Sequence, residues 1–190
     1  MKLVLGLGNI GAEYKETRHN CGFQVIELCA AFFHVKMKKR CFRLYQSATI
    51  KTETDNIYLI KPLTYMNNSG NILHHFKNVD PKDIIVICDQ MDLPPSYIRV
   101  KKGGGNAGHN GLKSIISNLG GNKDFIRIYV GIGRPKKNEN VVDYVLGIEE
   151  NKELYQEGIL KANEALKDLI NGKKLETVMQ TYNKKIKLWF

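Results

Sequence analysis

Residues 2–8, which read KLVLGLG, constrain the fold of this chain more than any other segment. Leu3, Val4 and Leu5 follow one another instead of alternating with polar residues, which is typical of a strand at the centre of a sheet covered on both faces. Residues 83–89, DIIVICD, give the clearest strand pattern of the chain. Together the two segments indicate an α/β protein with a buried sheet.

The other expected elements alternate between strands and helices. A loop from Asn9 to about His19 precedes a helix that should end near Phe33, and the polar turn TETDN should join a hairpin. The expected strands lie at residues 43–51, 57–61, 97–101 and 125–133, and the other expected helices at residues 71–76, 112–119, 151–171 and 174–185. We therefore expect a single domain over residues 1–190, with a twisted, mixed and mostly parallel sheet, one antiparallel insertion and flanking helices.

The formal net charge of the 190-residue chain is +10. A protein that acts on small neutral substrates has no need of this excess, which adds a long-range attraction for polyanions. Nucleic acid is the first candidate partner and an anionic membrane surface the second. No apolar run is long enough to span a bilayer, and the apolar stretch at the start is too short for a signal peptide. We expect a cytosolic protein without a membrane anchor.

The four cysteines indicate neither disulfides nor a metal site. Cys21, Cys29, Cys41 and Cys88 form no CxxC pair and have no metal-ligand spacing with histidine. Small, buried or half-buried thiols in a reducing compartment are the simplest interpretation. We expect no metal and no cofactor.

Residues 6–11, GLGNIG, match the GxGxxG pattern of dinucleotide-binding proteins. That mechanism needs a helix that begins inside the motif and an acidic residue at the end of the next strand. Here Glu13, Tyr14 and Lys15 come before any apolar helix pattern, and the later stretch FFHVKMKKR has no acid. The basic run leaves NADP open as an alternative. A tight turn that leaves Asn9 at the end of the first strand explains the glycines better.

Ligands of open α/β sheets bind beyond the carboxyl ends of the strands. This chain is expected to place there a set rich in amides with one pairing of histidine and aspartate: Asn9, Tyr14, His19, Asn20, Tyr65, Met66, Asn67, Asn68, Asp89, His109 and Asn110. It contains no GxSxG elbow and no paired catalytic carboxylates. Such a set favours attack by water with a general base, while amides hold a carbonyl and its oxyanion.

Each of these residues also has a purely structural interpretation. A histidine at a helix start is commonly a cap or a solvated side chain. His109 could be a bystander on the glycine loop, the stretch GGGNAGHNG at residues 103–111. Asp89 could cap the turn before Pro94, and Asn67 could be a turn residue. Spacing alone therefore indicates no more than a hydrolase.

Four stretches of the sequence resemble the bacterial type of peptidyl-tRNA hydrolase, in the same order and spacing. They are GLGNIGAEYKETRHNCGF, KPLTYMNNSG, DQMDLPPSYIRVKKGGGNAGHNGLKSII and VGIGRPKKNENVVDYVLG, spread over roughly residues 1–150. The resemblance implies an enzyme that hydrolyses the ester between a peptide, or an N-blocked amino acid, and the 3′ end of tRNA. It thereby releases free tRNA and peptide and recycles tRNA from aborted translation. The implied partner is tRNA, bound by a monomer.

The resemblance also implies a role for each matching residue. His19 matches the histidine that takes a proton from water, and Asp89 the carboxylate that holds this histidine. Asn9 matches the asparagine that distinguishes a blocked from a free amino group. The positions that match contacts to the tRNA or the peptide are Tyr14, Tyr65, Asn67, Asn110 and Lys101.

Two departures from the family pattern concern the RNA side of the site. The family commonly has arginine where this chain has Tyr129, and GGGHGGHNG where this chain reads GGGNAGHNG. In the resembling family this arginine helps to hold the tRNA phosphates, so other cations must make that contact here. A non-catalytic RNA-binding protein on the same fold is the alternative function. The presence of His19, Asp89 and Asn9 together argues against it, because a pure binder has no need of them.

Overall fold

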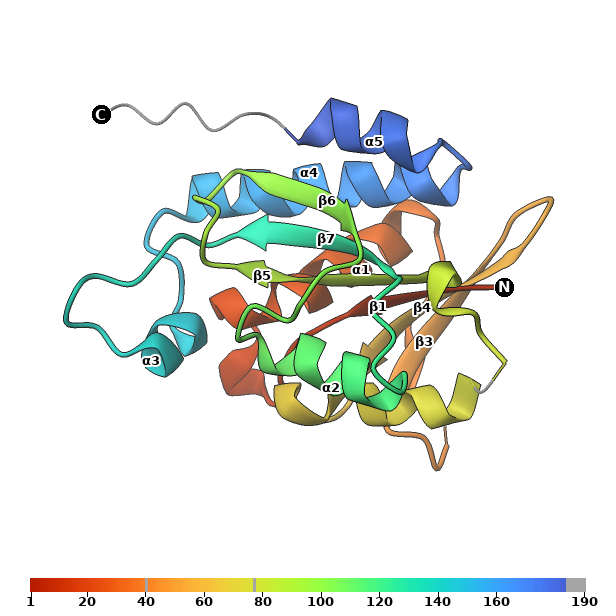
Figure 1. Ribbon diagram of the computed structural model, residues 1–190, viewed down its shortest axis with the longest axis horizontal. Coiled ribbons are helices and arrows are strands. Elements are labelled where there is room, and N and C mark those ends of the chain that lie inside the picture. The colour runs from red at the N-terminus through yellow and green to blue at the C-terminus, as the bar shows by residue number, and fades with distance from the viewer. Residues whose placement is uncertain (40, 77, 184–190) are drawn as a thin grey trace.

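The two apolar strands lie side by side in the computed structural model, which describes residues 1–39, 41–76 and 78–183. Strand β1 (Lys2–Gly6) pairs in parallel with β5 (Ile84–Gln90), and Leu3, Val4 and Leu5 are fully buried. In the described residues, seven strands form one sheet in the order β2-β3-β4-β1-β5-β7-β6 (Figure 1). The other strands are β2 (Lys38–Lys39), β3 (Tyr45–Lys51), β4 (Asn56–Pro62), β6 (Ile98–Lys102) and β7 (Ile126–Gly131).

The centre of the sheet is parallel and both edges are antiparallel. Strands β4, β1, β5 and β7 are parallel neighbours, whereas β2 pairs antiparallel with β3, β3 with β4, and β6 with β7. The expected hairpin is β3 and β4. Antiparallel pairing at the other edge was not expected, and it arises because β6 runs back along β7. The exposed cationic residues of β6 suit such an edge, since charges protect an edge strand from pairing with another chain.

Helices cover both faces of the sheet, so the expected α/β class with a mixed sheet and flanking helices is confirmed. Helices α1 (Cys21–Phe32), α4 (Lys152–Ile170) and α5 (Leu175–Tyr182) share one apolar core with the sheet. Helix α2 (Asn110–Asn118) and the 3₁₀ helix η3 (Met66–Phe76) share the other. No helix in the described parts of the chain is long and apolar enough to cross a bilayer.

Some helices differ from the sequence expectation. Helix α3 (Val141–Leu146) was not expected, because six residues are too few to show a helical period. The helix expected at residues 71–76 begins earlier, at Met66, and is of the 3₁₀ type. The last expected helix ends at Tyr182, and residues 184–185 of that expectation lie outside the described residues.

Glycines bring β1 and α1 into close contact. A Cβ atom on Gly6 would lie 2.2 Å from the Gly22 carbonyl oxygen, and one on Gly22 would lie 2.4 Å from the Leu7 nitrogen. Helix α1 begins at Cys21, ten residues after Gly11, so its amino end does not lie inside the GxGxxG stretch. The glycines therefore serve this crossing and the tight turn after β1, and the geometry of a dinucleotide site is absent from this stretch.

Candidate active site

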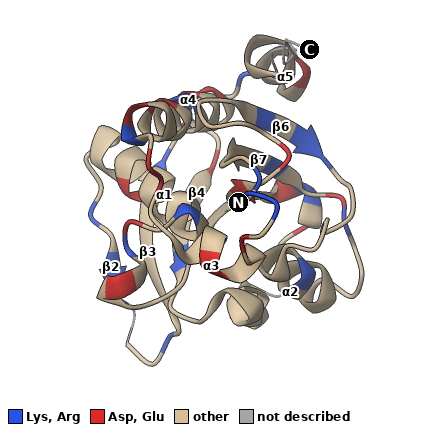
Figure 2. Ribbon diagram, turned by 90° about the vertical axis from the view of Figure 1, so that its left-hand side faces the viewer, with Lys and Arg blue, Asp and Glu red and all other residues tan. Residues whose placement is uncertain are grey.

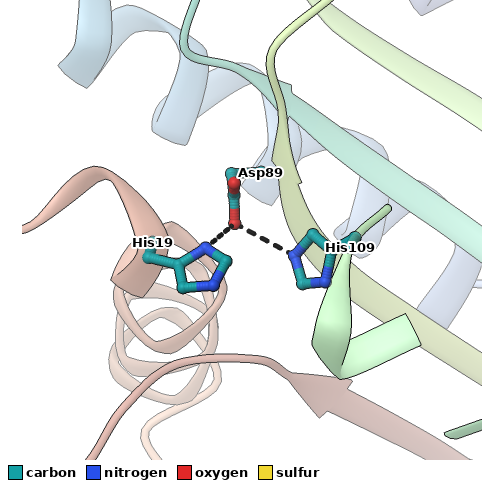
Figure 3. Close-up of side chains that lie close together, drawn as sticks. All are labelled: His19, Asp89 and His109. Atoms are coloured by element: carbon teal, nitrogen blue, oxygen red, sulfur yellow. Dashed lines mark hydrogen bonds and ion pairs between the residues drawn. The ribbon is translucent and has the colours of Figure 1, made fainter. Parts of the chain in front are cut away.

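Three side chains meet beyond the carboxyl end of β5. Asp89 comes from β5, His19 from the 3₁₀ turn η2 (Arg18–Asn20) before α1, and His109 from the position before α2. The Asp89 Oδ1 atom lies 2.7 Å from His19 Nδ1 and 3.1 Å from His109 Nε2 (Figure 3). The exposed fractions of the three side chains are 4%, 12% and 9%, in the same order. One buried carboxylate oxygen thus holds two imidazoles.

The hydrogen bonds assign a tautomer to each ring. His109 caps α2, and its Nδ1 accepts from the backbone N–H groups of Gly111 and Leu112 at 3.1 and 3.3 Å. Its proton therefore sits on Nε2 and is donated to Asp89. His19 donates to the same carboxylate through Nδ1, which leaves the lone pair of its Nε2 available. His19 is thus oriented as a base, and His109 as a second donor to Asp89.

The environment of Asp89 keeps its carboxyl group ionised. Burial raises the pKa of this group, but the charge and hydrogen bonds of His19 and His109 lower the pKa more. The net pKa lies well below the ordinary range of aspartate. A carboxylate in this state can stabilise an imidazolium that forms on His19 during a reaction.

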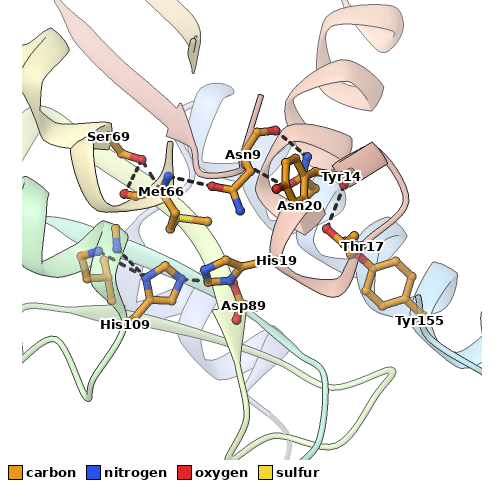
Figure 4. A network of polar contacts seen from close by, with 12 residues as sticks. Asn9, Tyr14, Thr17, His19, Asn20, Met66, Ser69, Asp89, His109 and Tyr155 are labelled. Atoms are coloured by element: carbon orange, nitrogen blue, oxygen red, sulfur yellow. Dashed lines mark hydrogen bonds and ion pairs between the residues drawn. The ribbon is translucent and has the colours of Figure 1, made fainter. Parts of the chain in front are cut away.

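Asn9 joins this group through a pair of asparagines. The Asn9 backbone N–H donates to Asn20 Oδ1 at 2.8 Å, and Asn20 Nδ2 donates back to the Asn9 carbonyl at 3.0 Å (Figure 4). Asn20 adjoins His19 in the chain, so this pair fixes Asn9 relative to the base. Asn9 Oδ1 accepts from the Met66 N–H at 2.8 Å, which orients its amide. Nothing among the described residues accepts from Asn9 Nδ2, so Asn9 can offer a substrate only a donor.

A buried ion pair anchors the turn that carries His19. Arg18 is 7% exposed, and its Nε donates to Glu149 Oε2 at 2.8 Å. Its Nη1 donates to the Tyr144 carbonyl at 3.0 Å, and its guanidinium lies over the Tyr144 ring. The Arg18 N–H also donates to the Gly147 carbonyl. Helix α3 and the segment that follows it therefore fix the backbone next to His19.

The nearby thiols are unsuited to covalent catalysis. Cys21 follows the His19 turn and Cys88 precedes Asp89, and both are fully buried. Burial and the charge of Asp89 raise the pKa of both thiols well above the ordinary value. Since the thiolate is the nucleophilic form, these cysteines are unreactive.

His19, Asp89 and His109 have ligand atoms within 4.8 Å of one another, a spacing that a metal ion could bridge. A ligand nitrogen must be unprotonated. In the arrangement described here, however, both imidazole nitrogens that face Asp89 carry protons. Binding a metal at all three would also release His109 from its role as the α2 cap. The hydrogen-bonded state therefore fits proton transfer better than metal coordination.

The other predicted site residues make no hydrogen bond to this group in the described structure. Tyr65, Asn67 and Asn110 are exposed, and Tyr14 is half-buried at the end of the turn η1 (Ala12–Tyr14). Lys101 is exposed on β6, whose cationic residues are blue in Figure 2. The position that a Cβ atom would take on Gly104 is 3.2 Å from Lys101 Nζ, so this ammonium lies beside the glycine loop.

A buried arginine forms hydrogen bonds to the backbone of the glycine loop. Arg127 is fully buried and donates to the carbonyls of Gly104 and Gly105. Its Nη1 also donates to the Tyr129 hydroxyl at 3.0 Å. Tyr129 is 7% exposed, and burial raises the pKa of its hydroxyl. At the position where the resembling family commonly has arginine, this chain therefore has a buried partner of Arg127 and no exposed cation.

Sequence reasoning found the pairing of His19 with Asp89 but missed much of what holds it. His109 was considered a possible bystander, yet it shares the Asp89 oxygen. Its place directly before a helix pattern was the signal for a cap. The pairing of Asn20 with Asn9 had no sequence signal. The Arg18–Glu149 pair joins residues 131 positions apart, a distance at which single-sequence patterns give no information.

Comparison with known proteins gives one consistent result. The family model described as "Peptidyl-tRNA hydrolase" matches residues 3–188. A curated peptidyl-tRNA hydrolase of Geobacillus thermodenitrificans is 44% identical over 189 residues, covering 96% of this chain and 100% of the relative. One of Lactiplantibacillus plantarum is 47% identical over 150 residues, covering 77% of this chain and 80% of the relative.

The solved structures agree with the sequence relatives. The crystal structure of peptidyl-tRNA hydrolase from Acinetobacter baumannii superimposes with a TM-score of 0.87 at 34% sequence identity. The match covers 96% of this chain and 94% of the other. The likeness therefore extends through the whole sheet and the helices on both of its faces.

Proposed function

The chain belongs to the peptidyl-tRNA hydrolase family of enzymes, and we propose that His19 is its general base, held by Asp89, for attack of water on the ester. The observation that carries this proposal is the 2.7 Å contact between His19 Nδ1 and Asp89 Oδ1. Because Nδ1 donates to the carboxylate, Nε2 is the atom that can take a proton. A water molecule held at Nε2 would attack the acyl carbon of the ester.

In the proposed step, His19 carries one proton from the attacking water to the leaving ribose oxygen. As the water oxygen bonds to the acyl carbon, its proton passes to His19 Nε2 and the carbonyl becomes an oxyanion. The nearby carboxylate of Asp89 stabilises the imidazolium. Collapse of the tetrahedral intermediate breaks the bond to the ribose oxygen, which recovers the proton from the imidazolium. The tRNA leaves with its hydroxyl restored, and the peptide leaves as a carboxylic acid.

Asn9 is proposed to stabilise the substrate through its Nδ2 donor. Two of the first N–H groups of α2 are already bonded to His109, so the start of this helix offers few donors for an oxyanion. The Asn9 side-chain amide is oriented by the Met66 N–H and the Asn9 backbone is held by Asn20, so the amide is preorganised for a carbonyl oxygen. An N-blocked substrate presents an amide carbonyl near the ester, whereas a free amino group is largely charged and is also a donor. Two donors facing each other are mismatched, which favours the N-blocked substrate.

Five residues outside the buried group are proposed to hold the tRNA. Lys101, Asn110, Tyr65 and Asn67 are exposed, Tyr14 is half-buried, and the net charge of +10 favours a polyanion. Base reading is not required, because phosphate and shape contacts position RNA without it. We also propose that the protein acts as a monomer in the cytosol. Its four free cysteines fit a reducing compartment.

Hydrolysis of an N-acetyl-aminoacyl-tRNA in ¹⁸O-labelled water tests the proposal. We expect release of tRNA, one ¹⁸O atom in the carboxylate product and none in the ribose, with little hydrolysis of the free aminoacyl-tRNA. Label in the ribose would contradict attack at the acyl carbon. The alternative, a non-catalytic RNA-binding protein, predicts binding of the same tRNA with no release above the rate in buffer.

A further inference from the structure

The turn that carries His19 has little intrinsic stability. The 3₁₀ turn η2 is three residues long, and no side chain caps its amino end in the described part of the chain. Turns of this type stay short because their hydrogen bonds are poorly aligned. In the same part of the chain, the His19 ring has one hydrogen bond, to Asp89. The 2.7 Å contact between His19 Nδ1 and Asp89 Oδ1 therefore depends on what holds the backbone of this turn.

Residues from the last third of the chain hold that backbone. Thr17 forms an isolated β-bridge with Ile148, and the Thr17 carbonyl accepts from the Tyr155 hydroxyl at 3.3 Å (Figure 4). The Arg18 N–H donates to the Gly147 carbonyl at 3.0 Å. The backbone just before His19 is therefore attached to the segment between α3 and α4.

The Arg18–Glu149 ion pair joins the same two segments through side chains, which are 8% and 10% exposed. Glu149 is fixed at both oxygens, because Oε1 accepts from the Asn151 N–H at 3.2 Å. Tyr144, whose ring and carbonyl contact the Arg18 guanidinium, donates its hydroxyl to the Ile132 carbonyl just after β7. Each group that holds the guanidinium is thus itself held by another part of the fold.

A buried ion pair is a weak source of net stability. Taking two charges out of water costs free energy that their attraction commonly does not offset, and apolar pairs of similar size are often as stable or more stable. Stability therefore gives little reason to bury Arg18 and Glu149. A charged and directional pair can, however, fix the register of the two segments that it joins.

We propose that Arg18 and Glu149 are positioning residues for the reaction, which hold His19 where it can take a proton from the attacking water. The inference rests on the general-base role proposed above and adds to it the group that places the base. The Arg18 guanidinium bonds to Glu149 and Tyr144 instead of to His19 or Asp89, so it acts through the backbone. Small displacements of a reacting group slow a reaction strongly. Loss of the pair should therefore lower activity without lowering stability.

The experiment replaces the pair by apolar residues of similar size. Arg18→Met/Glu149→Leu leaves neither charge buried alone, so urea titration should give a free energy of unfolding equal to that of the wild type or higher. With N-acetyl-aminoacyl-tRNA, kcat should fall about tenfold while KM changes less than about twofold, because the base is misplaced and the substrate contacts remain. Arg18→Lys keeps the charge without the planar fork of donors and should retain more of the wild-type kcat. Lys167→Met/Glu164→Leu, which removes an ion pair within α4, is the matched control and should keep the wild-type kcat.

The outcomes separate this inference from the function on which it rests. If the wild type does not hydrolyse the substrate, or His19→Ala hydrolyses it at the wild-type rate, the proposed function falls and the inference falls with it. If only His19→Ala is inactive, an unchanged kcat in the folded Arg18→Met/Glu149→Leu protein overturns the positioning role alone. A variant that loses stability together with activity overturns it as well, because the pair would then serve the fold instead of the base.

Discussion

The site has two regions that differ in how their side chains are held. The buried centre is formed by His19, Asp89, His109 and Asn9. Each of these side chains is fixed by at least one hydrogen bond within the protein. On the exposed rim, formed by Tyr65, Asn67, Lys101 and Asn110, the side chains face solvent. Donors and acceptors fixed before the substrate arrives stabilise a transition state without reorganisation. This difference fits the proposed roles, chemistry for the centre and contact with RNA for the rim.

The largest expected effect is at the base in the buried centre. His19→Ala should lower turnover of N-acetyl-aminoacyl-tRNA at least about a hundredfold, because general-base catalysis is lost. The comparison is with His74→Ala, which removes an exposed histidine of η3 and should keep wild-type turnover. Near-normal turnover in a folded His19→Ala protein would show that another group activates the water.

Removing the charge of Asp89 should have a smaller effect. Asp89→Asn keeps a side chain of the same shape, so the imidazole of His19 remains but is held less well and its charged form is less stabilised. We expect turnover to fall by less than in His19→Ala. A larger loss than in His19→Ala, with the fold intact, would mean that Asp89 takes a more direct part than holding the histidine.

The stability of the protein should depend on Asp89 in acid. The folded pKa of Asp89 lies below its unfolded value of about 3.9, so its ionised form stabilises the fold above that pH. This contribution is lost as the pH falls through the lower, folded pKa. The difference in unfolding free energy between the wild type and Asp89→Asn should therefore not change with pH around pH 5, and it should become smaller as the pH falls towards 2. Urea titrations at several pH values measure it, and a constant difference would contradict the lowered pKa.

Selectivity for N-blocked substrates should depend on the Asn9 donor. Asn9→Asp can still accept from the Met66 N–H but loses the NH₂ group, whereas Asn9→Ala loses both. We expect the ratio of kcat/KM for N-acetyl-aminoacyl-tRNA to that for free aminoacyl-tRNA to fall in both variants. The fall should be greater in Asn9→Asp, because its charge attracts the free ammonium group. If the ratio is unchanged in both, another residue makes the distinction.

The smallest expected effect concerns a single phosphate contact on the rim. Lys101→Ala, made in a His19→Ala background, should weaken tRNA binding and reduce the slope of log affinity against log salt by about 0.9. Lys38→Ala removes an exposed lysine from the edge strand β2 at the opposite side of the sheet and serves as the control. Parallel salt lines for Lys101→Ala and its parent would assign the phosphate contact to other cations, such as Arg134 and Lys113.

The parts of the molecule that could be predicted from the sequence are those set by local pattern. Continuous apolar residues predicted β1 and β5, and the rule that parallel strands end at one edge brought His19 and Asp89 together. The antiparallel edge strand β6 and the role of His109 depend on how distant segments pack, which a local pattern does not contain. The exchange of the family's arginine for Tyr129 was visible in the sequence. The burial of Tyr129 and its hydrogen bond from Arg127 could not be predicted from the sequence.

The proposed division between a catalytic centre and an RNA-binding rim is tested most directly by comparing two substrates. Single-turnover hydrolysis is measured with saturating enzyme for N-acetyl-aminoacyl-tRNA and for N-acetyl-aminoacyl-adenosine, which lacks the acceptor stem. His19→Ala should slow both substrates by the same large factor. Lys101→Ala should leave both saturated rates near the wild type and raise only the enzyme concentration needed to saturate the tRNA substrate. A folded His19→Ala protein that hydrolyses the adenosine ester at the wild-type rate would contradict the assignment of the chemistry to the buried centre.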